Sequence, residues 1–177
     1  EAAAQAYPGA FTAERPLRVL YLGQVNMRKG AHRLFEAMQT LAEEPVELHL
    51  VGPGDLPPPD PGEWPAIRAH GPVSRARAAE HYRQADVFIL PTLSDGFALT
   101  QLEAQAWKLP VLASANCGAV VKDGVNGLLM DPPTRENIVA ALRRCLAQPQ
   151  ELAAWSRNSG VDEQFSLGAL SRTLAAY

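Results

Sequence analysis

The sequence predicts an α/β fold, a Rossmann-like doubly wound parallel sheet of about six strands. Short apolar runs of strand length alternate with longer stretches whose apolar residues recur at helical spacing, the pattern of a parallel sheet covered by helices. The length and composition agree, because 177 residues with 47% apolar and 20% charged side chains suit one globular domain. We expect residues 16–177 to form this domain and residues 1–15 to be a linker or an artificial extension.

Each strand is predicted from a short apolar run that ends in a turn signal. The six expected strands are residues 18–23, 46–52, 67–71, 86–92, 110–114 and 127–130. A proline-rich loop at 53–65 follows the second of them and cannot pair in a central sheet.

The helices are predicted from apolar stripes and capping residues. One lies between Gly30 and Glu43, where apolar residues share a face, and Ser74 caps another that runs to Ala85. Residues 97–107 form a third, and Thr134 caps a fourth. Apolar residues at helical spacing between 167 and 177 predict that the tail also packs as helix.

Charge and cysteine content exclude several classes of protein. A formal net charge of −3 offers no electrostatic footprint for nucleic acid. The two cysteines, Cys117 and Cys145, have no neighbouring ligands at zinc spacing, so neither a disulfide scaffold nor a metal site is expected and a reducing, cytoplasmic setting fits. No apolar stretch reaches the roughly 20 residues that span a bilayer, so any membrane contact would be peripheral.

In open parallel sheets, ligands bind outside the carboxyl ends of the strands. The loop at 23–30 leaves the first strand there and opens into a helix, whose free N–H groups, together with the ammonium of Lys29, suit a phosphate. Neither a P-loop nor a GxGxxG fingerprint is present. The residues alone fit equally a glycine-bounded turn with two solvated cations.

Residues 91–104 are a more specific segment, in which a strand ends, a glycine-containing loop follows and a helix begins. Asp95 and Glu103 are eight positions apart, so one precedes the helix and the other lies about one and a half turns inside it. A loop carboxylate and a helix-borne binder of hydroxyl groups would then face one cleft. The spacing also fits an ordinary acid at a helix start and a surface glutamate.

Five segments, in order and at matching intervals, carry a family resemblance. They are the strand-Gly-x5-Lys-Gly loop, the turn at 51–54, the segment at 70–73, the acid-x7-Glu motif and the turn at 123–129. Over residues 18–177 the chain resembles the C-terminal, donor-binding half of retaining GT-B glycosyltransferases of glycosyltransferase family four, or group 1. The expected fold is therefore one half of a GT-B fold.

The resemblance implies a glycosyltransferase domain that takes a sugar from a nucleoside-diphosphate-sugar and passes it to an acceptor with retention of configuration. Lys29 matches the family's diphosphate-binding lysine, Asp95 the acid that contacts the donor sugar, and Glu103 the acid that binds ribose hydroxyls. Lys29 and Asp95 are the expected catalytic residues. The expected donor-binding set is Gly23, Gln24, Lys29, Gly71, Val73, Asp95, Gly96, Phe97, Ala98, Leu99 and Glu103. No metal or cofactor is expected, because a helix start and a lysine stabilise the departing diphosphate and no DxD occurs.

The resemblance also implies partners and a location. They are a nucleotide sugar and a missing N-terminal acceptor domain, without which the isolated domain would be inactive. The expected location is the cytoplasm, with any contact at the inner membrane face made through that missing half.

Four positions depart from the family pattern. Gln24 occupies the position of a frequent phosphate-binding arginine, and Asp95 replaces the usual glutamate. Ala98 replaces a second glycine, and Lys108 replaces a glycine that commonly ends the helix. They keep open a degenerate GT-B binding or interaction module without catalysis. A related sugar-nucleotide epimerase or phosphorylase is a further alternative, against which the acid-x7-Glu spacing argues.

The chain has four histidines, and only His70, in the segment at 70–73, belongs to one of these motifs. We expect ordinary structural roles for His32, His49 and His81, whereas the role of His70, at a strand end near the predicted cleft, is open.

Overall fold

Six parallel strands form a single sheet, in the order β3-β2-β1-β4-β5-β6. The computed structural model describes residues 2–60 and 62–165. The strands are β1 (Leu17–Leu22), β2 (Val46–Val51), β3 (Ile67–Gly71), β4 (Val87–Leu90), β5 (Val111–Ala113) and β6 (Gly127–Leu129). The doubly wound α/β class predicted from the sequence is confirmed.

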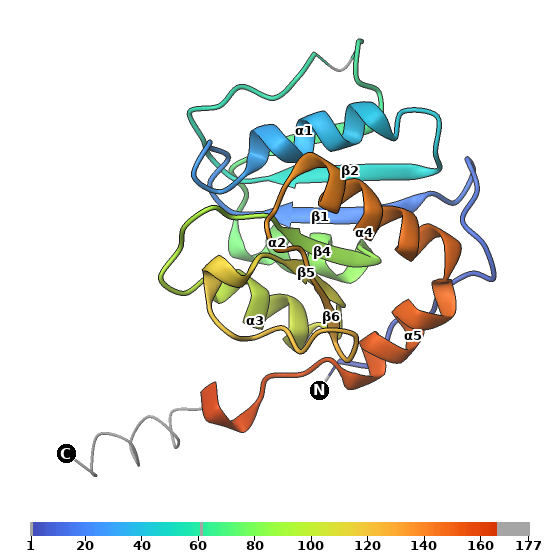
Figure 1. Cartoon of the computed structure of the whole chain (residues 1–177), viewed down its shortest axis with the longest axis vertical. Coiled ribbons are helices and arrows are strands. Elements are labelled where there is room, and N and C mark those ends of the chain that lie inside the picture. Colours follow the sequence, from blue (N-terminus) through green and yellow to red (C-terminus); the bar gives the residue numbers. More distant parts are fainter. Residues whose placement is uncertain (1, 61, 166–177) are drawn as a thin grey trace.

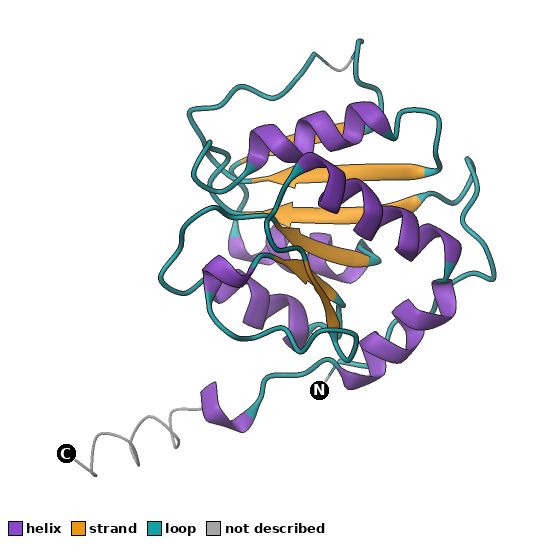
Figure 2. Cartoon of the chain, in the orientation of Figure 1, coloured by secondary structure: helices purple, strands orange, loops and turns teal. Residues whose placement is uncertain are grey.

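Helices cover both faces of the sheet (Figure 2). They are α1 (Ala31–Thr40), α2 (Arg75–Gln84), α3 (Leu99–Ala106), α4 (Arg135–Ala147) and α5 (Pro149–Asn158), with short 3-10 turns at Ala115–Cys117 and Glu163–Phe165. In Figure 1, α1 and α4 lie side by side in front of the sheet and α2 lies behind it. The predicted caps are present, since the hydroxyls of Ser74 and Thr134 accept bonds from the third residue after each.

Most element boundaries differ from the sequence prediction by one to three residues. The strand expected at 86–92 is shorter, and the helix expected from Phe97 begins two residues later, at Leu99. We did not predict α5 as a separate helix, although Pro149 stands at its first position, where a missing N–H costs nothing. The helix expected within 167–177 lies outside the described residues.

The centre of the sheet is apolar on both sides. All four residues of β4 and all three of β5 are buried, as parallel strands between two helical layers require. Each fully buried Val, Leu, Ile or Phe side chain among them contributes about 1.5–3 kcal/mol. The sheet is therefore a rigid platform for the loops at its carboxyl edge.

The segment before β1, which we expected to be a linker, lies against the domain. The backbone N–H of Gln5 donates to Ser156 Oγ at 2.8 Å, and the Tyr7 hydroxyl donates to the carbonyl of Asp86 at 2.8 Å. Arg15 binds both carboxylate oxygens of Asp86, at 2.7 and 2.6 Å, and Asp86 is only 3% exposed. No helix among the described residues is both long and apolar enough to cross a bilayer.

Candidate functional site

The order of the sheet reverses between β1 and β4, which are neighbours although β2 and β3 lie between them in sequence. The loops that follow these two strands therefore diverge from one point at the carboxyl edge, the usual place for a ligand in such sheets. The Leu93 N–H donates to the Arg28 carbonyl at 2.9 Å, and the Arg28 guanidinium donates to the Ser94 carbonyl at 3.0 Å. The two loops thus form one structure.

Gly30 makes this close approach possible. Its φ of 76° lies in the left-handed region, and a Cβ there would stand 1.9 Å from the carbonyl oxygen of Pro91. Any side chain would force the two loops apart. The glycine that follows Lys29 therefore holds the β1 loop against the β4 loop.

Lys29 and Asp95, 66 positions apart, meet where the two loops touch. The Lys29 ammonium donates to the Asp95 carboxylate, and each side chain is only 15% exposed. The Lys29 backbone N–H donates to Asn26 Oδ1 at 2.9 Å, which fixes the lysine at the end of its loop. The structure thus brings together the two residues expected to be catalytic.

The loop that carries Asp95 is also fastened to the segment after β5. The Asp95 N–H donates to the Asn116 carbonyl at 2.9 Å, and the Ala98 N–H donates to the Cys117 carbonyl at 3.1 Å. The backbone N–H of Ala98, one of the expected donor-binding residues at 96–99, is therefore already bonded within the protein. Ala98 is the N-cap of α3 and no side chain caps this helix, so its first turn can receive an anion.

Glu103 lies in α3 and makes its contact towards α2. Its Oε2 accepts a bond of 2.9 Å from the hydroxyl of Tyr82, which is 2% exposed. Burial raises the pKa of Tyr82, so the phenol remains a hydrogen-bond donor. We did not predict this partner, because a tyrosine in a helix is normally a core residue.

The other predicted donor-binding residues lie at the carboxyl ends of β1 and β3. Gln24 is exposed, and its carbonyl accepts a bond of 2.6 Å from the buried hydroxyl of Tyr21. Gly71 has a φ of 65°, and Val73 packs against the core before α2 begins. Gly71 also borders a hollow of about 350 Å³ whose wall includes Val25, Gly52, Leu56 and Pro72. Gly23 continues the pairing of β1 with β2 at this edge of the sheet, since its N–H donates to the Val51 carbonyl at 3.0 Å.

Lys108 occupies the position where α3 ends, and its backbone explains why glycine is common there. Its φ of 60° is the only positive φ at a residue other than glycine in the described part of the chain. The ammonium of Lys108 donates to the Ser159 carbonyl at 2.7 Å. Lys108 therefore adopts a left-handed backbone conformation, and its side chain links the end of α3 to the segment after α5.

Comparison with known proteins places this arrangement in a family. The family described as Glycosyl transferases group 1 matches residues 16–148. The chain is 34% identical over 164 residues to a D-inositol 3-phosphate glycosyltransferase of Geodermatophilus obscurus, covering 82% of this chain and 36% of that protein. A relative of the same name in Xylanimonas cellulosilytica is 35% identical over 154 residues, covering 78% and 37%. The chain thus spans little more than a third of these relatives.

Solved structures share the fold. Sucrose-phosphate synthase of Thermosynechococcus elongatus superposes with a TM-score of 0.72 at 28% identity, over 94% of this chain and 47% of that one. HepE of Anabaena in complex with UDP gives a TM-score of 0.74 at 20% identity, over 93% and 50%. These neighbours are GT-B glycosyltransferases, so the chain has the fold of one half of a GT-B protein.

Proposed function

This chain belongs to the group 1 glycosyl transferases, and we propose that it is the half that binds a nucleoside-diphosphate-sugar. The observation that carries the proposal is the meeting of Lys29 and Asp95 at the point where the order of the sheet reverses. An ammonium group, a carboxylate and an uncapped helix start stand together there. Such a site can receive a diphosphate and the sugar attached to it.

The diphosphate interacts with Lys29 and with the start of α3. As the bond to the sugar breaks, negative charge grows on the leaving diphosphate, and these groups stabilise it without a metal. Lys29 exchanges its bond to Asp95 for one to phosphate, and the freed carboxylate of Asp95 then contacts the sugar hydroxyls. We propose that transfer retains the configuration at the anomeric carbon.

The nucleoside lies towards α2 and β3. Glu103 binds the ribose hydroxyls with the oxygen that Tyr82 does not use, and Tyr82 is a positioning residue that fixes the carboxylate. Backbone groups at Gly71 and Val73 contact the base beside the hollow that Gly71 borders.

A second domain completes the active site. Four large apolar side chains of the two site loops and the start of α3 are at least one-third exposed, namely Met27, Leu93, Phe97 and Leu99. We propose that the acceptor-binding half covers them, and that the whole protein works in the cytoplasm. Any contact with the inner membrane face is then made by that half.

Titration with UDP, GDP and ADP, followed by amide chemical shifts, tests the proposal. We expect one nucleotide to bind weakly, Lys29→Ala and Glu103→Ala to weaken it, and the isolated chain to give no sugar transfer. Lys122→Ala is the matched control, because it removes an ammonium group that pairs with Asp162 rather than with Asp95. Absence of binding by all three nucleotides would favour a degenerate interaction module. Proton NMR of the product made by the full-length enzyme tests retention.

A further inference from the structure

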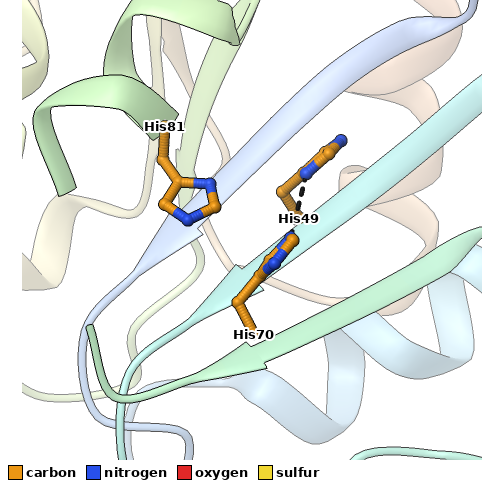
Figure 3. Close-up of side chains that lie close together, drawn as sticks. All are labelled: His49, His70 and His81. Atoms are coloured by element: carbon orange, nitrogen blue, oxygen red, sulfur yellow. Dashed lines mark hydrogen bonds between the residues drawn. The ribbon is translucent and has the colours of Figure 1, made fainter. Parts of the chain in front are cut away.

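Three histidines that are far apart in the sequence converge behind the sheet. His49 lies on β2, His70 on β3 and His81 on α2, and one ring nitrogen from each falls within 4.8 Å of the other two (Figure 3). His49 Nδ1 and His70 Nε2 are 3.1 Å apart, and the His70 and His81 ring centroids are 4.5 Å apart. We expected structural roles for His49 and His81, and spacings of 21 and 11 residues carry no zinc signature.

The surroundings of His49 suit a ligand of a metal. Its other ring nitrogen, Nε2, is buried without a hydrogen-bond partner and lies 3.8 Å from Oε2 of Glu47. If Nδ1 gives its lone pair to a cation, the proton must sit on Nε2, where the nearby carboxylate is the natural acceptor. Metal-bound histidines usually donate their second N–H to a carboxylate or carbonyl in this way.

We propose that His49, His70 and His81 bind one divalent transition metal ion of the zinc class, with Glu47 as the carboxylate that orients His49. Imidazole nitrogens suit Zn²⁺, Ni²⁺ and Cu²⁺, and three of them leave a fourth position for water. His70 is exposed, so water reaches the site. The site is distinct from the Lys29–Asp95 pair, and the proposed sugar transfer does not use it.

Small side-chain rotations bring the three nitrogens to binding distance. Tetrahedral ligands at about 2.05 Å from zinc stand about 3.3 Å apart. The pair at 3.1 Å already meets this spacing, and the widest separation of 4.8 Å must shrink by about 1.5 Å. The ring of the exposed His70 and that of His81, on the surface of α2, can turn by this amount.

The charge of the surroundings allows a cation. Glu47 and Glu80 face the cluster, as do Arg18, Arg68 and Arg77, and one of these arginines, Arg68, is paired with Glu47 at 2.6 Å. Burial lowers the pKa of each of the three imidazoles, so near neutral pH each ring keeps the lone pair that a metal needs.

Calorimetric titration of ZnCl2 into untagged chain stripped with EDTA tests the site. We expect one equivalent to bind, and at free Zn²⁺ a hundred times Kd the unfolding equilibrium constant falls about a hundredfold. His70→Ala and His81→Ala each weaken binding at least about tenfold, and Glu47→Gln weakens it by about ten- to a hundredfold. His32→Ala, on α1, leaves it unchanged.

Cobalt absorption distinguishes these ligands from the thiols. Bound Co²⁺ should show the visible bands of a nitrogen-ligated tetrahedral ion without a sulfur charge-transfer band, because both cysteines are at most 1% exposed. The exposed position of His70 makes its variant decisive even if His49→Ala fails to fold. Failure to bind one equivalent of metal would overturn the proposal, whatever nucleotide the chain binds. So would binding by the His70→Ala and His81→Ala variants as tight as that of the parent chain.

Discussion

Replacing Lys29 by alanine tests the phosphate role most directly. The substitution removes one charge-assisted hydrogen bond to phosphate, about 1.5–3 kcal/mol, which weakens nucleoside diphosphate binding about ten- to a hundredfold. It also leaves the carboxylate of Asp95, whose side chain is only 15% exposed, without its neutralising partner. At an effective dielectric constant of about 20, that carboxylate repels a phosphate charge about 6 Å away by about 3 kcal/mol. Together the two terms amount to about 4.5–6 kcal/mol, so the loss should reach at least about a thousandfold.

Asp95→Asn separates the two contributions. The amide removes the repulsion and frees the Lys29 ammonium, so the nucleoside diphosphate should bind more tightly than to the parent chain. In the Asp95→Asn background, Lys29→Ala should remove only the hydrogen bond and cost about ten- to a hundredfold, a coupling of about 3 kcal/mol between two residues in contact. A nucleotide sugar should gain less than the free diphosphate, because it loses the contact between Asp95 and the sugar.

Amide chemical-shift titrations of the four chains measure these weak affinities, and circular dichroism confirms that each variant is folded. An affinity unchanged within twofold in a folded Lys29→Ala variant would refute the phosphate role. Equal losses on Lys29→Ala in both backgrounds would show that Asp95 does not face the diphosphate.

Three further changes test the framework by urea unfolding. Gly30→Ala should destabilise by about 2–4 kcal/mol, because its Cβ would meet the carbonyl of Pro91 at a left-handed backbone, and an unchanged midpoint would contradict the close packing. Arg15→Met should cost about 3–5 kcal/mol, since it leaves the carboxylate of Asp86 buried without a counter-charge and bonded only to the Arg18 N–H, whereas a cost below about 0.5 kcal/mol would mean that the N-terminal segment contributes little. Lys108→Gly should be about 1 kcal/mol more stable than Lys108→Ala, because both lose the ammonium but only glycine relieves the positive φ; the reverse order would contradict that backbone.

The sequence was enough to predict the fold because periodicity and turn residues agree. Runs such as those at 46–51 and 87–90 have few alternatives to strands once helical stripes flank them. The start of α3 at Leu99 was harder to predict, because neither Gly96 nor Phe97 indicates where the loop ends and the helix begins. The bonds of Asp95 and Ala98 to the segment after β5 decide it, and such bonds join residues about twenty positions apart.

The candidate site was predictable to the extent that its residues stand in ordered motifs. Lys29 and Asp95 follow neighbouring strands of a doubly wound sheet, so the topology itself brings them together. The contact between Tyr82 and Glu103 and the three converging histidines depend on side-chain directions across two or three elements. The spacing of these residues in the sequence does not reveal those directions, because each residue fits the ordinary periodicity of its own strand or helix.

The loop between β3 and α2 connects the two proposed sites. His70 is the residue before Gly71, and His81 lies on the helix that follows Val73. The segment proposed to contact the nucleotide base therefore lies between two ligands of the proposed metal. Because Gly71 has a φ of 65°, the turn depends on backbone freedom at one residue, and fixing His70 against His81 limits that freedom. A metal bound there would order the loop before nucleotide arrives, which reduces the entropy lost on binding.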